Sequence, residues 1–294
     1  MRESKQMPRM PRMSRIPRMS KMSNMITLSH SKISTWKSCR RQYKFIYDDK
    51  ISPIDEPTYF ALGRSIHDSL SKFYAIEPEM RTQQDLVNWF AKSLADDWSR
   101  LTSRREAYPD DERDYKSTVE NGYTMLTRYW NRYGIDKQIG KCLTEHQVSV
   151  QLTDNLSFTG KLDCLTSNWI IEHKTGNITV EDLALEDDQS FMYCWLMRKV
   201  GRPVKGTVYN IIPSPTAQSS SFQRVPIERT DNELASVESE ILQIAEEIEW
   251  LPRLPTRSYS CKSCQFRMLC RAERQGGDVE YLIDSKFRRA NETA

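Results

Sequence analysis

The sequence lacks a long apolar run, and this absence narrows the classes of protein that it can encode. No segment reaches the eighteen or so consecutive apolar residues that a membrane-spanning helix needs. The N-terminus is charged but has no apolar stretch of the kind found in a secretory signal. We therefore expect a cytoplasmic protein, or a viral protein in the host cytoplasm, that does not contact a membrane.

A strong net charge is also missing from most of the chain. The formal net charge of the 294 residues is +3, but residues 1–25 contain seven Lys or Arg and one acidic residue, so the remaining residues sum to −3. Any binding of nucleic acid by residues 26–294 must then come from local patches. The repetitive Met/Pro/Arg/Ser composition of residues 1–25 predicts disorder. This stretch is a nucleic-acid-binding tail, an organelle-targeting peptide or translated sequence ahead of a later start.

No phosphate-binding loop is recognisable. Residues 134–142, GIDKQIGKC, have five rather than four residues between the glycines. Cys142 also stands where Ser or Thr would bind magnesium. We therefore expect no ATP dependence and neither ATPase nor helicase activity.

The periodicity of the apolar residues favours an α/β fold. A short helix is expected after Ser31, which would be its N-cap. Apolar residues at helical spacing predict helices at 58–75, 82–104, 112–133, 181–199 and 231–250. Alternation or apolar runs predict strands at 143–152, 156–166, 169–174 and 204–212. This order of helices, a small mixed sheet and further helices is typical of an α/β fold.

The most informative segment is 160–176, GKLDCLTSNWIIEHKTG. If residues 167–168 form the loop of a tight hairpin, Asp163 lies opposite Glu172, with Cβ atoms about 5 Å apart. Lys174 lies on the same face, because side chains alternate along a strand. The segment therefore predicts two carboxylates and an ammonium around one point.

Two opposed carboxylates resist joint ionisation, and a divalent cation between them removes that penalty. Oxygen ligands of this kind suit Mg²⁺ or Mn²⁺. Lys174 would then activate a metal-bound water or stabilise a phosphate oxygen. The alternative is a solvated surface ladder in which Lys174 neutralises one acid. The apolar run 169–171 before Glu172 favours the metal site, because it indicates a buried strand that ends in a charge.

Seven cysteines without a secretory signal favour metal ligation over disulfides. Cys261, Cys264 and Cys270 follow the ligand spacing C-x2-C-x5-C, and Cys39 is the natural fourth thiolate. Four thiolates suit a [4Fe–4S] cluster or Zn²⁺ almost equally on chemistry alone. The other three cysteines lack such spacing and are expected to be buried as small apolar side chains: Cys142, Cys164 and Cys194.

Basic and aromatic residues alternate beside these cysteines. Cations that contact phosphates and rings that stack on bases suit a single strand of nucleic acid. Ordinary surface charge explains the pattern almost as well. The candidate nucleic-acid contacts are Trp36, Arg40, Arg41, Tyr43, Lys44 and Arg267.

Asp163 followed by Glu172-His173-Lys174 and then Thr-Gly resembles the D…(D/E)xK-T-G signature of RecB-like nucleases in the PD-(D/E)XK superfamily. The resemblance implies that both acids bind metal together with the backbone carbonyl of His173, and that Lys174 is catalytic. His173 stands where that family usually has an aromatic residue. The implied fold is a restriction-endonuclease-like core, a small mixed sheet flanked by helices, with a helical insertion.

Two helical motifs extend this resemblance. Gly63 and His67 resemble the family's G-x-x-x-H motif, in which the histidine is a further metal ligand. Taken alone, His67 would more often be a packed or exposed histidine. Gln189 and Tyr193 resemble its Q-x-x-x-Y motif, whose side chains would contact DNA and hold the lysine or the scissile phosphate. The alternative is a buried Tyr193 and an exposed Gln189.

The division of the cysteines, one early and three late, resembles the iron–sulfur clasp of AddB-type and CRISPR-associated RecB-like nucleases. That resemblance favours [4Fe–4S] over zinc, although Arg40 follows Cys39 where the family usually has proline. Its implied role is structural, because it would close a loop of more than two hundred residues. We expect one nuclease domain over 26–294, with a helical part at about 58–135 and a catalytic core at about 140–250.

The implied function is that of a metal-dependent deoxyribonuclease, an exonuclease acting on single-stranded DNA ends. Protein partners in repair, recombination or CRISPR adaptation would fit this activity. A rival interpretation is a catalytically inactive DNA-binding or assembly subunit on the same scaffold. A third is a zinc-stapled RNA-processing enzyme, which would be colourless.

Overall fold

The computed structural model of the protein describes residues 25–103, 105–177, 188–216 and 221–289. Its centre is a mixed six-stranded sheet in the order β1-β4-β5-β6-β7, with β3 also paired to β4. The strands are β1 (Ile26–Ser29), β3 (Leu143–Thr153), β4 (Leu156–Leu165), β5 (Trp169–Thr175), β6 (Gly206–Ile212) and β7 (Gln223–Glu228). β1 is parallel to β4 and β5 is parallel to β6, whereas the remaining pairs are antiparallel.

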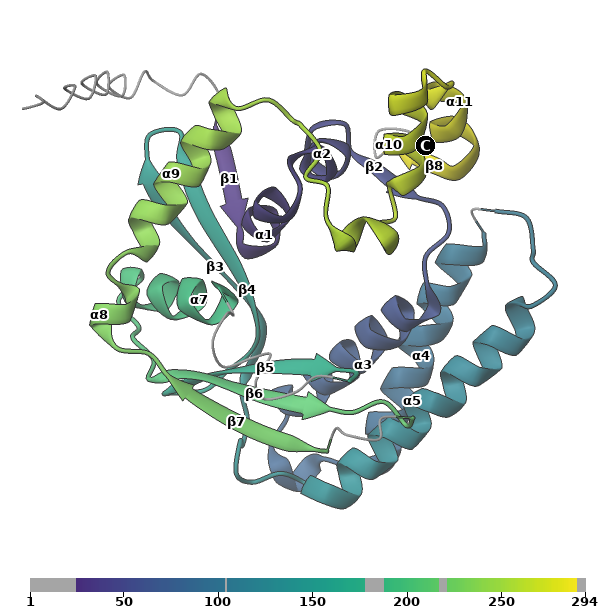
Figure 1. Ribbon diagram of the computed structural model, residues 1–294. Helices are drawn as coiled ribbons and strands as arrows, with labels where there is room; N and C mark the ends of the chain where they lie inside the picture. The colour runs from purple at the N-terminus through teal and green to yellow at the C-terminus, as the bar shows by residue number, and fades with distance from the viewer. Residues whose placement is uncertain (1–24, 104, 178–187, 217–220, 290–294) are drawn as a thin grey trace, which may run out of the picture.

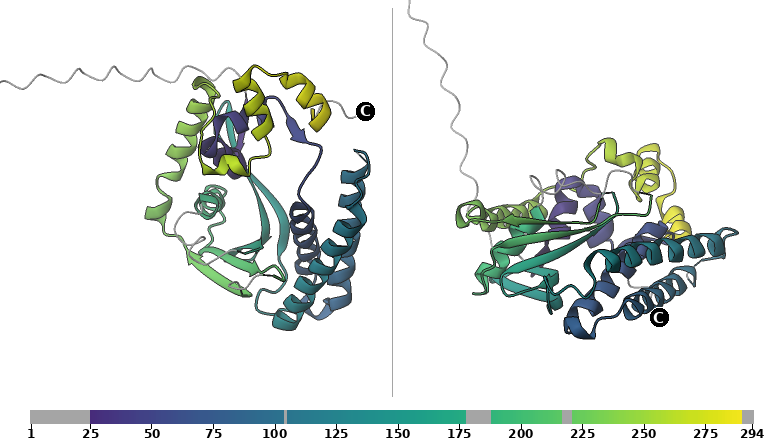
Figure 2. Two further views of the ribbon diagram at one scale, coloured as in Figure 1. Left: turned by 45° about the vertical axis from the view of Figure 1, so that its right-hand side comes forward. Right: turned by 90° about the horizontal axis from the view of Figure 1, so that it is seen from below.

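Three long helices cover one face of this sheet (Figures 1 and 2). They are α3 (Thr58–Ala75), α4 (Gln83–Thr102) and α5 (Asp111–Tyr133). Apolar residues at helical spacing in α3, such as Ile66, Leu70 and Phe73, are fully buried. They share a core with Cys164 and Ile171 of the sheet. This face of the sheet therefore rests on the helical part of the chain.

A second group of helices packs on the opposite face, as Figure 1 shows. The group consists of α1 (His30–Ser38), α7 (Asp188–Lys199), α8 (Asp231–Leu234) and α9 (Val237–Trp250). Its apolar core includes Leu165 and Ile170 of the hairpin and every residue of α7 from Met192 to Met197. The alternation of side chains along β4 and β5 thus divides the hairpin between two separate cores.

An early segment of the chain, residues 40–53, meets the last described residues in a small third unit. β2 (Ile51–Pro53) and β8 (Phe287–Arg289) form an antiparallel two-stranded sheet. Around it lie α2 (Arg40–Tyr43), the π-helix η1 (Lys44–Asp48), α10 (Arg267–Gln275) and α11 (Val279–Lys286). The Phe45 and Phe266 rings pack at a centroid separation of 5.3 Å. Two short 3-10 helices complete the structure, η2 (Pro78–Met80) and η3 (Tyr259–Lys262).

The predicted order of helices and strands is confirmed from residue 58 to residue 212, apart from the part of the predicted 181–199 helix that lies outside the described residues. Three details were wrong or missed. The first helix begins at His30, one residue before the predicted cap, and Ser29 is its N-cap, accepting from the Lys32 N–H at 3.3 Å. The expected helix at 231–250 is two helices, α8 and α9. β1, β7 and the β2–β8 sheet were not predicted. No helix within the described ranges is both long and apolar enough to span a membrane.

Candidate active site

The predicted register of the β4–β5 hairpin is confirmed at both of its paired positions. Residues 164–165 lie opposite 171 and 170, respectively. Beyond them the strands separate, so the predicted cross-strand pair of Asp163 and Glu172 is not part of the ladder. Asp163 instead interacts through its side chain, and its Oδ2 accepts from the His173 N–H at 2.9 Å. A carboxylate therefore takes a backbone donor at the point where the sheet opens.

The opening is a fork in the sheet. On one edge of β4, residues 156–159 pair with β1 and residues 164–165 pair with β5. Between these two pairings, residues 160–163 have no strand partner on that edge within the described ranges, although residues 160–162 pair with β3 on the other edge. Side chains from helices on both faces can reach this gap. α3 contributes His67 and α7 contributes Gln189 and Tyr193.

His67 and Asp163 form an ion pair across the fork, with Nδ1 and Oδ2 3.3 Å apart. Burial opposes the charged form of each group. For Asp163, the hydrogen bond from His67 and the positive charge of that ring outweigh burial and lower the pKa of the carboxyl. For His67, the same carboxylate outweighs burial and raises the pKa of the imidazole. The two motifs that supply these residues are therefore brought into direct contact.

Glu172 has two carboxylate oxygens with different surroundings. Oε1 accepts from Lys174 Nζ at 3.2 Å and from Gln189 Nε2 at 2.9 Å, while Lys174 also donates to Gln189 Oε1 at 2.8 Å. Oε2 is buried and has no hydrogen-bond partner within the described part of the chain. Burial first, and the negative charge of Asp163 second, raise the pKa of Glu172 to about 7.

This carboxylate pair is suited to a divalent cation. A buried oxygen without a partner is costly, and a second carboxylate nearby adds repulsion. A cation at Oε2 would satisfy the oxygen and cancel the repulsion. Within the described residues, however, no three His, Cys, Asp or Glu side chains are close enough together to hold one ion. The side chains as they stand thus provide the donors and charge for a metal, but not a closed ligand set.

His173 explains how a histidine fits at this position of the signature. Its ring is buried and stacks on Tyr74, with centroids 5.6 Å apart. The Asn210 amide lies 2.8 Å from Nδ1, and Cys164 Sγ lies 3.5 Å from Nε2. Burial lowers the pKa of the imidazole to about 3, so the ring is neutral at pH 7. It therefore packs as a neutral aromatic side chain.

A buried polar network behind His173 was not predicted from the sequence. Asn210 also donates to the Tyr129 hydroxyl at 2.9 Å, and the Tyr129 and Tyr74 hydroxyls are hydrogen bonded to each other. Tyr74 donates to Asp136 Oδ2 at 2.5 Å, and Arg224 Nη1 donates to Asp136 Oδ1 at 2.9 Å. Only Arg224 and Asp136 carry charge, and they lie on segments that show no motif. The network reaches the site through His173, which it holds in place.

Gly63 and Tyr193 mark two close approaches to the fork. A Cβ atom on Gly63 would lie 3.3 Å from Thr175 Oγ1, so the glycine lets α3 approach the end of β5. Tyr193 is buried, and burial together with the Glu172 charge raises its pKa to about 12. Its ring packs against Gly160 of β4, where a Cβ atom would lie 2.9 Å from Tyr193 Cε1.

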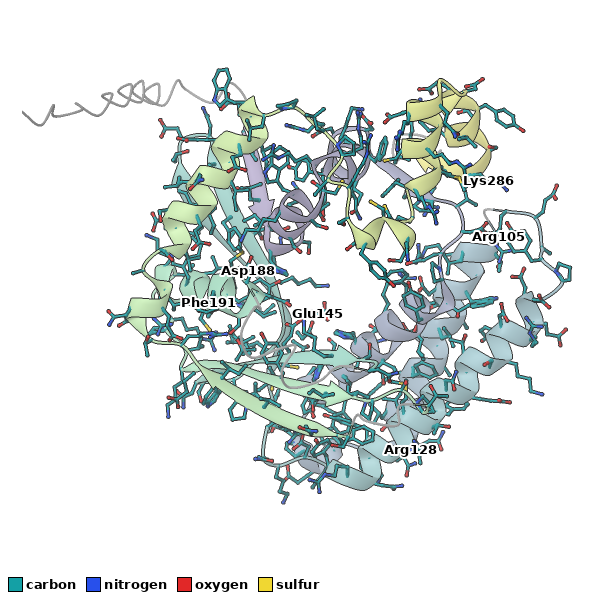
Figure 3. All side chains as sticks on the ribbon, in the orientation of Figure 1. Arg105, Arg128, Glu145, Asp188, Phe191 and Lys286 are labelled. Carbon is teal, nitrogen blue, oxygen red and sulfur yellow. The ribbon has the colours of Figure 1, made fainter. Side chains whose placement is uncertain are left out.

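A cavity of about 940 Å³ opens beside His67 and Asp163. Its wall includes Glu145 and Lys161, which form an ion pair, and the aromatic residues Tyr59 and Phe60. Figure 3 shows Glu145 between α7 and α3, and β3, which carries it, contacts both helices. Glu145 has a positive φ of 50°, a strained conformation for a residue other than glycine, in an irregular position of β3.

The cysteine cluster gathers the four predicted residues, all partly exposed, at one place. The Thr256 N–H donates to Cys39 Sγ at 3.4 Å, and Cys261 Sγ donates to the Thr256 carbonyl at 3.7 Å. Burial raises the pKa of Cys270 to about 11, with further contributions from nearby negative charge that include Cys264 and Cys39. The cluster is not compact enough, within the described residues, to hold a single ion. The remaining cysteines are buried, as predicted: Cys142, Cys164 and Cys194.

The predicted nucleic-acid contacts beside the cysteines need correction. The Trp36 and Tyr43 side chains are only 2% and 4% exposed and belong to the main core, so their rings are not available to stack on bases. Trp36 Nε1 donates to Glu247 at 3.1 Å. Arg267 is exposed. The other three basic residues form ion pairs with acidic residues: Arg40 with Glu247, Arg41 with Glu273 and Lys44 with Asp49.

Comparisons with known proteins find one family and two solved structures that are similar to this chain. The sequence profile of the PD-(D/E)XK nuclease superfamily matches residues 27–271. A solved structure from Eubacterium rectale, described as a "putative exonuclease", is 14% identical, with a TM-score of 0.46, over 81% of this chain and 85% of its own. The structure named SSO0001 is 16% identical, with a TM-score of 0.35, over 74% and 96%. No curated protein matches the chain.

Proposed function

Because the chain belongs to the PD-(D/E)XK nuclease superfamily and is therefore a nuclease, we propose that it hydrolyses single-stranded DNA from its ends with a divalent metal. The observation that best supports this proposal is made at the fork. There Glu172 has a buried oxygen without a partner among the described residues, next to the ionised Asp163. The Lys174 ammonium is held against the same Glu172. Two carboxylates that can ligate a metal ion and a lysine that can donate hydrogen bonds are groups that metal-dependent phosphodiester hydrolysis uses.

The metal would be Mg²⁺ or Mn²⁺, held by His67, Asp163, Glu172 and the backbone carbonyl of His173. When bound, such an ion supplies positive charge to the phosphate oxygens and lowers the pKa of a water. The lowered pKa of Asp163 favours an ionised carboxylate there, while Glu172 takes up or releases its proton near neutrality. The chain thereby keeps a site that is charged enough to attract a cation.

Lys174 and its neighbours position the reacting groups. Gln189 contacts both Lys174 Nζ and Glu172, so it holds the ammonium at a defined place beside the carboxylate. From there Lys174 donates a hydrogen bond to a phosphate oxygen or to the attacking water. Tyr193, one helical turn after Gln189, packs at the floor of the fork and supports α7 there.

The decisive test is cleavage of single-stranded oligonucleotides, labelled at either end, in the presence of Mn²⁺. We expect the Lys174→Ala and Glu172→Gln variants to lose activity by about a hundredfold or more, since removing one group that stabilises the transition state commonly costs that much. Lys199→Ala is the matched control, because Lys199 pairs with Glu238 at the far end of α7. Shortening of the labelled strand one nucleotide at a time identifies an exonuclease, and the labelled end gives its polarity.

Equal cutting by wild type and Lys174→Ala would eliminate the proposed site. Binding without cutting, by the wild type in either Mg²⁺ or Mn²⁺, would favour the catalytically inactive DNA-binding subunit. Faster cutting of RNA than of DNA by the same site would favour an RNA-processing enzyme.

We also propose that Cys39, Cys261, Cys264 and Cys270 hold a [4Fe–4S] cluster. The donor set fits, because four thiolates from an early and a late segment of the chain lie near one another, and Cys264 and Cys270 pack against the small apolar core. A cubane cluster has its iron atoms at separate corners, so its ligands need not converge on a single point. Zinc, which requires four ligands around one ion, is the alternative.

A further inference from the structure

Two aromatic rings at the start of α3 are exposed to solvent next to each other. Tyr59 is 63% exposed and Phe60 is 42% exposed. Their ring centroids are 4.5 Å apart, with an angle of 40° between the rings. Single exposed aromatic residues are common, whereas two adjacent exposed rings form an apolar patch of the kind found at binding sites.

The pair lies on the wall of the cavity that contains the candidate active site. Tyr59, Phe60, His67 and Asp163 all line this cavity. Phe60 and His67 are seven residues apart, so they share one face of α3 at a separation of about 10 Å along the helix. A ligand that reaches Asp163 through the cavity therefore passes the rings.

The charges of the cavity favour contact through bases over contact through phosphates. Among the described residues, its two full cations are both neutralised: Arg64 by Glu56 and Asp97, and Lys161 by Glu145. Paired cations attract phosphates weakly. A strand that binds here must obtain much of its affinity in another way, and stacking on aromatic rings is the alternative that single-strand-binding proteins use.

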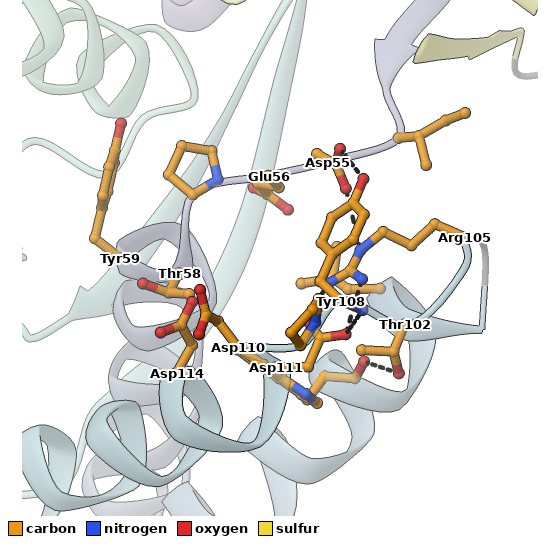
Figure 4. A pocket seen from close by; sticks show the side chains of 15 residues that line it. Asp55, Glu56, Thr58, Tyr59, Thr102, Arg105, Tyr108, Asp110, Asp111 and Asp114 are labelled. Atoms are coloured by element: carbon orange, nitrogen blue, oxygen red, sulfur yellow. Dashed lines mark hydrogen bonds and ion pairs between the residues drawn. The ribbon is translucent and has the colours of Figure 1, made fainter. Parts of the chain in front are cut away.

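Beyond Tyr59 the surface becomes acidic. A second cavity, also lined by Tyr59, contains Asp55, Asp110 and Asp114, and its Arg105 is paired with Asp55 and Asp111. Figure 4 shows the Tyr59 side chain standing apart from this acidic group. Acidic side chains repel phosphates, so the second cavity is unsuited to the continuation of a nucleic-acid strand.

We propose that Tyr59 and Phe60 are a stacking subsite for the unpaired bases of a single strand whose scissile phosphate lies at Asp163 and Glu172. The proposal rests on the proposed function only for the place of that phosphate. It defines the substrate class further, because bases within a duplex are already stacked and cannot cover the rings. Stacking accepts every base, so the subsite selects unpaired strands without selecting sequence.

The test measures binding in EDTA, where cleavage does not interfere. Fluorescence anisotropy compares the wild type with the double variant Tyr59→Leu/Phe60→Leu, which keeps an apolar surface and removes the rings. Tyr281→Leu is the matched control, since Tyr281 is 67% exposed on α11, away from the cavity lining. The probes are one single strand, a strand of equal length with abasic residues, and the corresponding blunt duplex.

We expect the double variant to bind the normal single strand at least about fivefold more weakly than the wild type, the lower limit for one stacked base. On the abasic strand the two proteins should bind equally, because the bases that the rings contact are gone. A KM raised by a similar factor with kcat unchanged, in Mn²⁺, should accompany the loss of binding.

Equal binding of the normal strand by wild type and double variant would overturn the stacking subsite, as would tighter binding of the duplex than of the single strand. A thermal scan would reveal a double variant that is less stable than the wild type. In that case the wild type alone decides whether bases are contacted, by its affinity for the normal strand compared with the abasic strand. If the wild type cuts DNA and only these differences are missing, the subsite is wrong and the proposed nuclease function stands.

Discussion

The two carboxylate oxygens of Glu172 have different surroundings and therefore different roles. Oε1 holds Lys174 and Gln189, and Oε2 is buried without a partner among the described residues. The sequence predicted that Glu172 and Lys174 would lie on one face, because strand alternation and a two-residue hairpin loop fix the side of every residue. It did not predict the role of Gln189 in the same detail, since that contact depends on how α7 packs across the fork.

The raised pKa of Glu172 predicts a fall in stability as the pH rises. A carboxyl with a pKa near 7 in the folded state and 4.5 in the unfolded state binds more protons when folded, so its stabilising contribution is lost as the pH passes through 7. His67, whose pKa is also raised, acts in the same direction. His173 acts in the opposite direction, but only between pH 3 and 6.5. The window that isolates the effect is therefore pH 6.5 to 8.

Across this window and without metal, we expect the Glu172 contribution to the free energy of unfolding to fall by roughly 1 kcal/mol, or about 2–4 °C in melting temperature. The melting curve of Glu172→Gln should lack this contribution and keep that of His67. Mn²⁺ should raise the melting temperature of the wild type more at pH 8 than at pH 6.5, because protons compete with the ion for Glu172. Parallel pH profiles of wild type and Glu172→Gln would contradict this assignment.

Trp36 and Tyr43 show where residue patterns mislead. Both alternate with basic residues in the sequence, as nucleic-acid contacts do, and both are buried. The cations beside them cover the rings from outside: the Arg253 guanidinium lies 4.9 Å from the Trp36 ring centroid. Aromatic and basic residues next to each other indicate either a binding surface or a capped core, and only burial separates the two. The exposed pair Tyr59 and Phe60 lacks adjacent cations, so the pattern did not find it.

At the scale of elements, the fork in the sheet creates the site. β4 is paired at both ends of one edge and unpaired between them, which admits α7 on one side and α3 on the other. The sequence predicted β4 and β5 almost to the residue, but not β1, because four residues that follow the repetitive Met/Pro/Arg/Ser stretch give too short a signal. Without β1 the fork cannot be foreseen. The sequence thus predicted which residues come together at the candidate site, but not the strand arrangement that leaves an opening for them.

The approach of α7 to β4 depends on Gly160. A Cβ atom there would lie 2.9 Å from Tyr193 Cε1 and 3.0 Å from Leu196 Cδ2, both on α7. We expect Gly160→Ala to destabilise the protein by about 1–3 kcal/mol through overpacking and to lower kcat, because a displaced α7 moves Gln189 away from Lys174. Melting temperature and the oligonucleotide assay measure the two effects.

Gly277→Ala is the control for this substitution. The nearest atom to its added Cβ is 3.5 Å away, an ordinary contact, and its φ is not in the left-handed region. It should leave both quantities close to those of the wild type. A Gly160→Ala protein with normal kcat would show that α7 does not position Gln189 in the way we propose.

At the scale of the whole molecule, the chain closes on itself. The β2–β8 pairing joins residues 51–53 to residues 287–289, and the unit built around it is set apart from the central sheet (Figure 1). Its apolar core is small, with six buried residues: Phe45, Ile51, Phe266, Leu269, Ile283 and Phe287. A core of this size stabilises a fold only weakly without a cross-link. Cys264 and Cys270 pack against this core, so a cross-link through the cysteines would stabilise the unit.

We therefore expect the proposed cluster to control the stability of this unit. Protein purified without oxygen should be brown, with broad visible absorbance. Cys39→Ser should lose the absorbance and expose residues 40–53 and 259–289 to limited proteolysis, while the central sheet stays folded. Cys142→Ala is the control, since Cys142 is buried elsewhere and the colour should persist. Colourless protein that contains one equivalent of zinc would show that the four cysteines hold zinc and not an iron–sulfur cluster. If the wild-type protein without iron or zinc and the Cys39→Ser variant both resist proteolysis, the apolar core and the β2–β8 pairing alone close the chain.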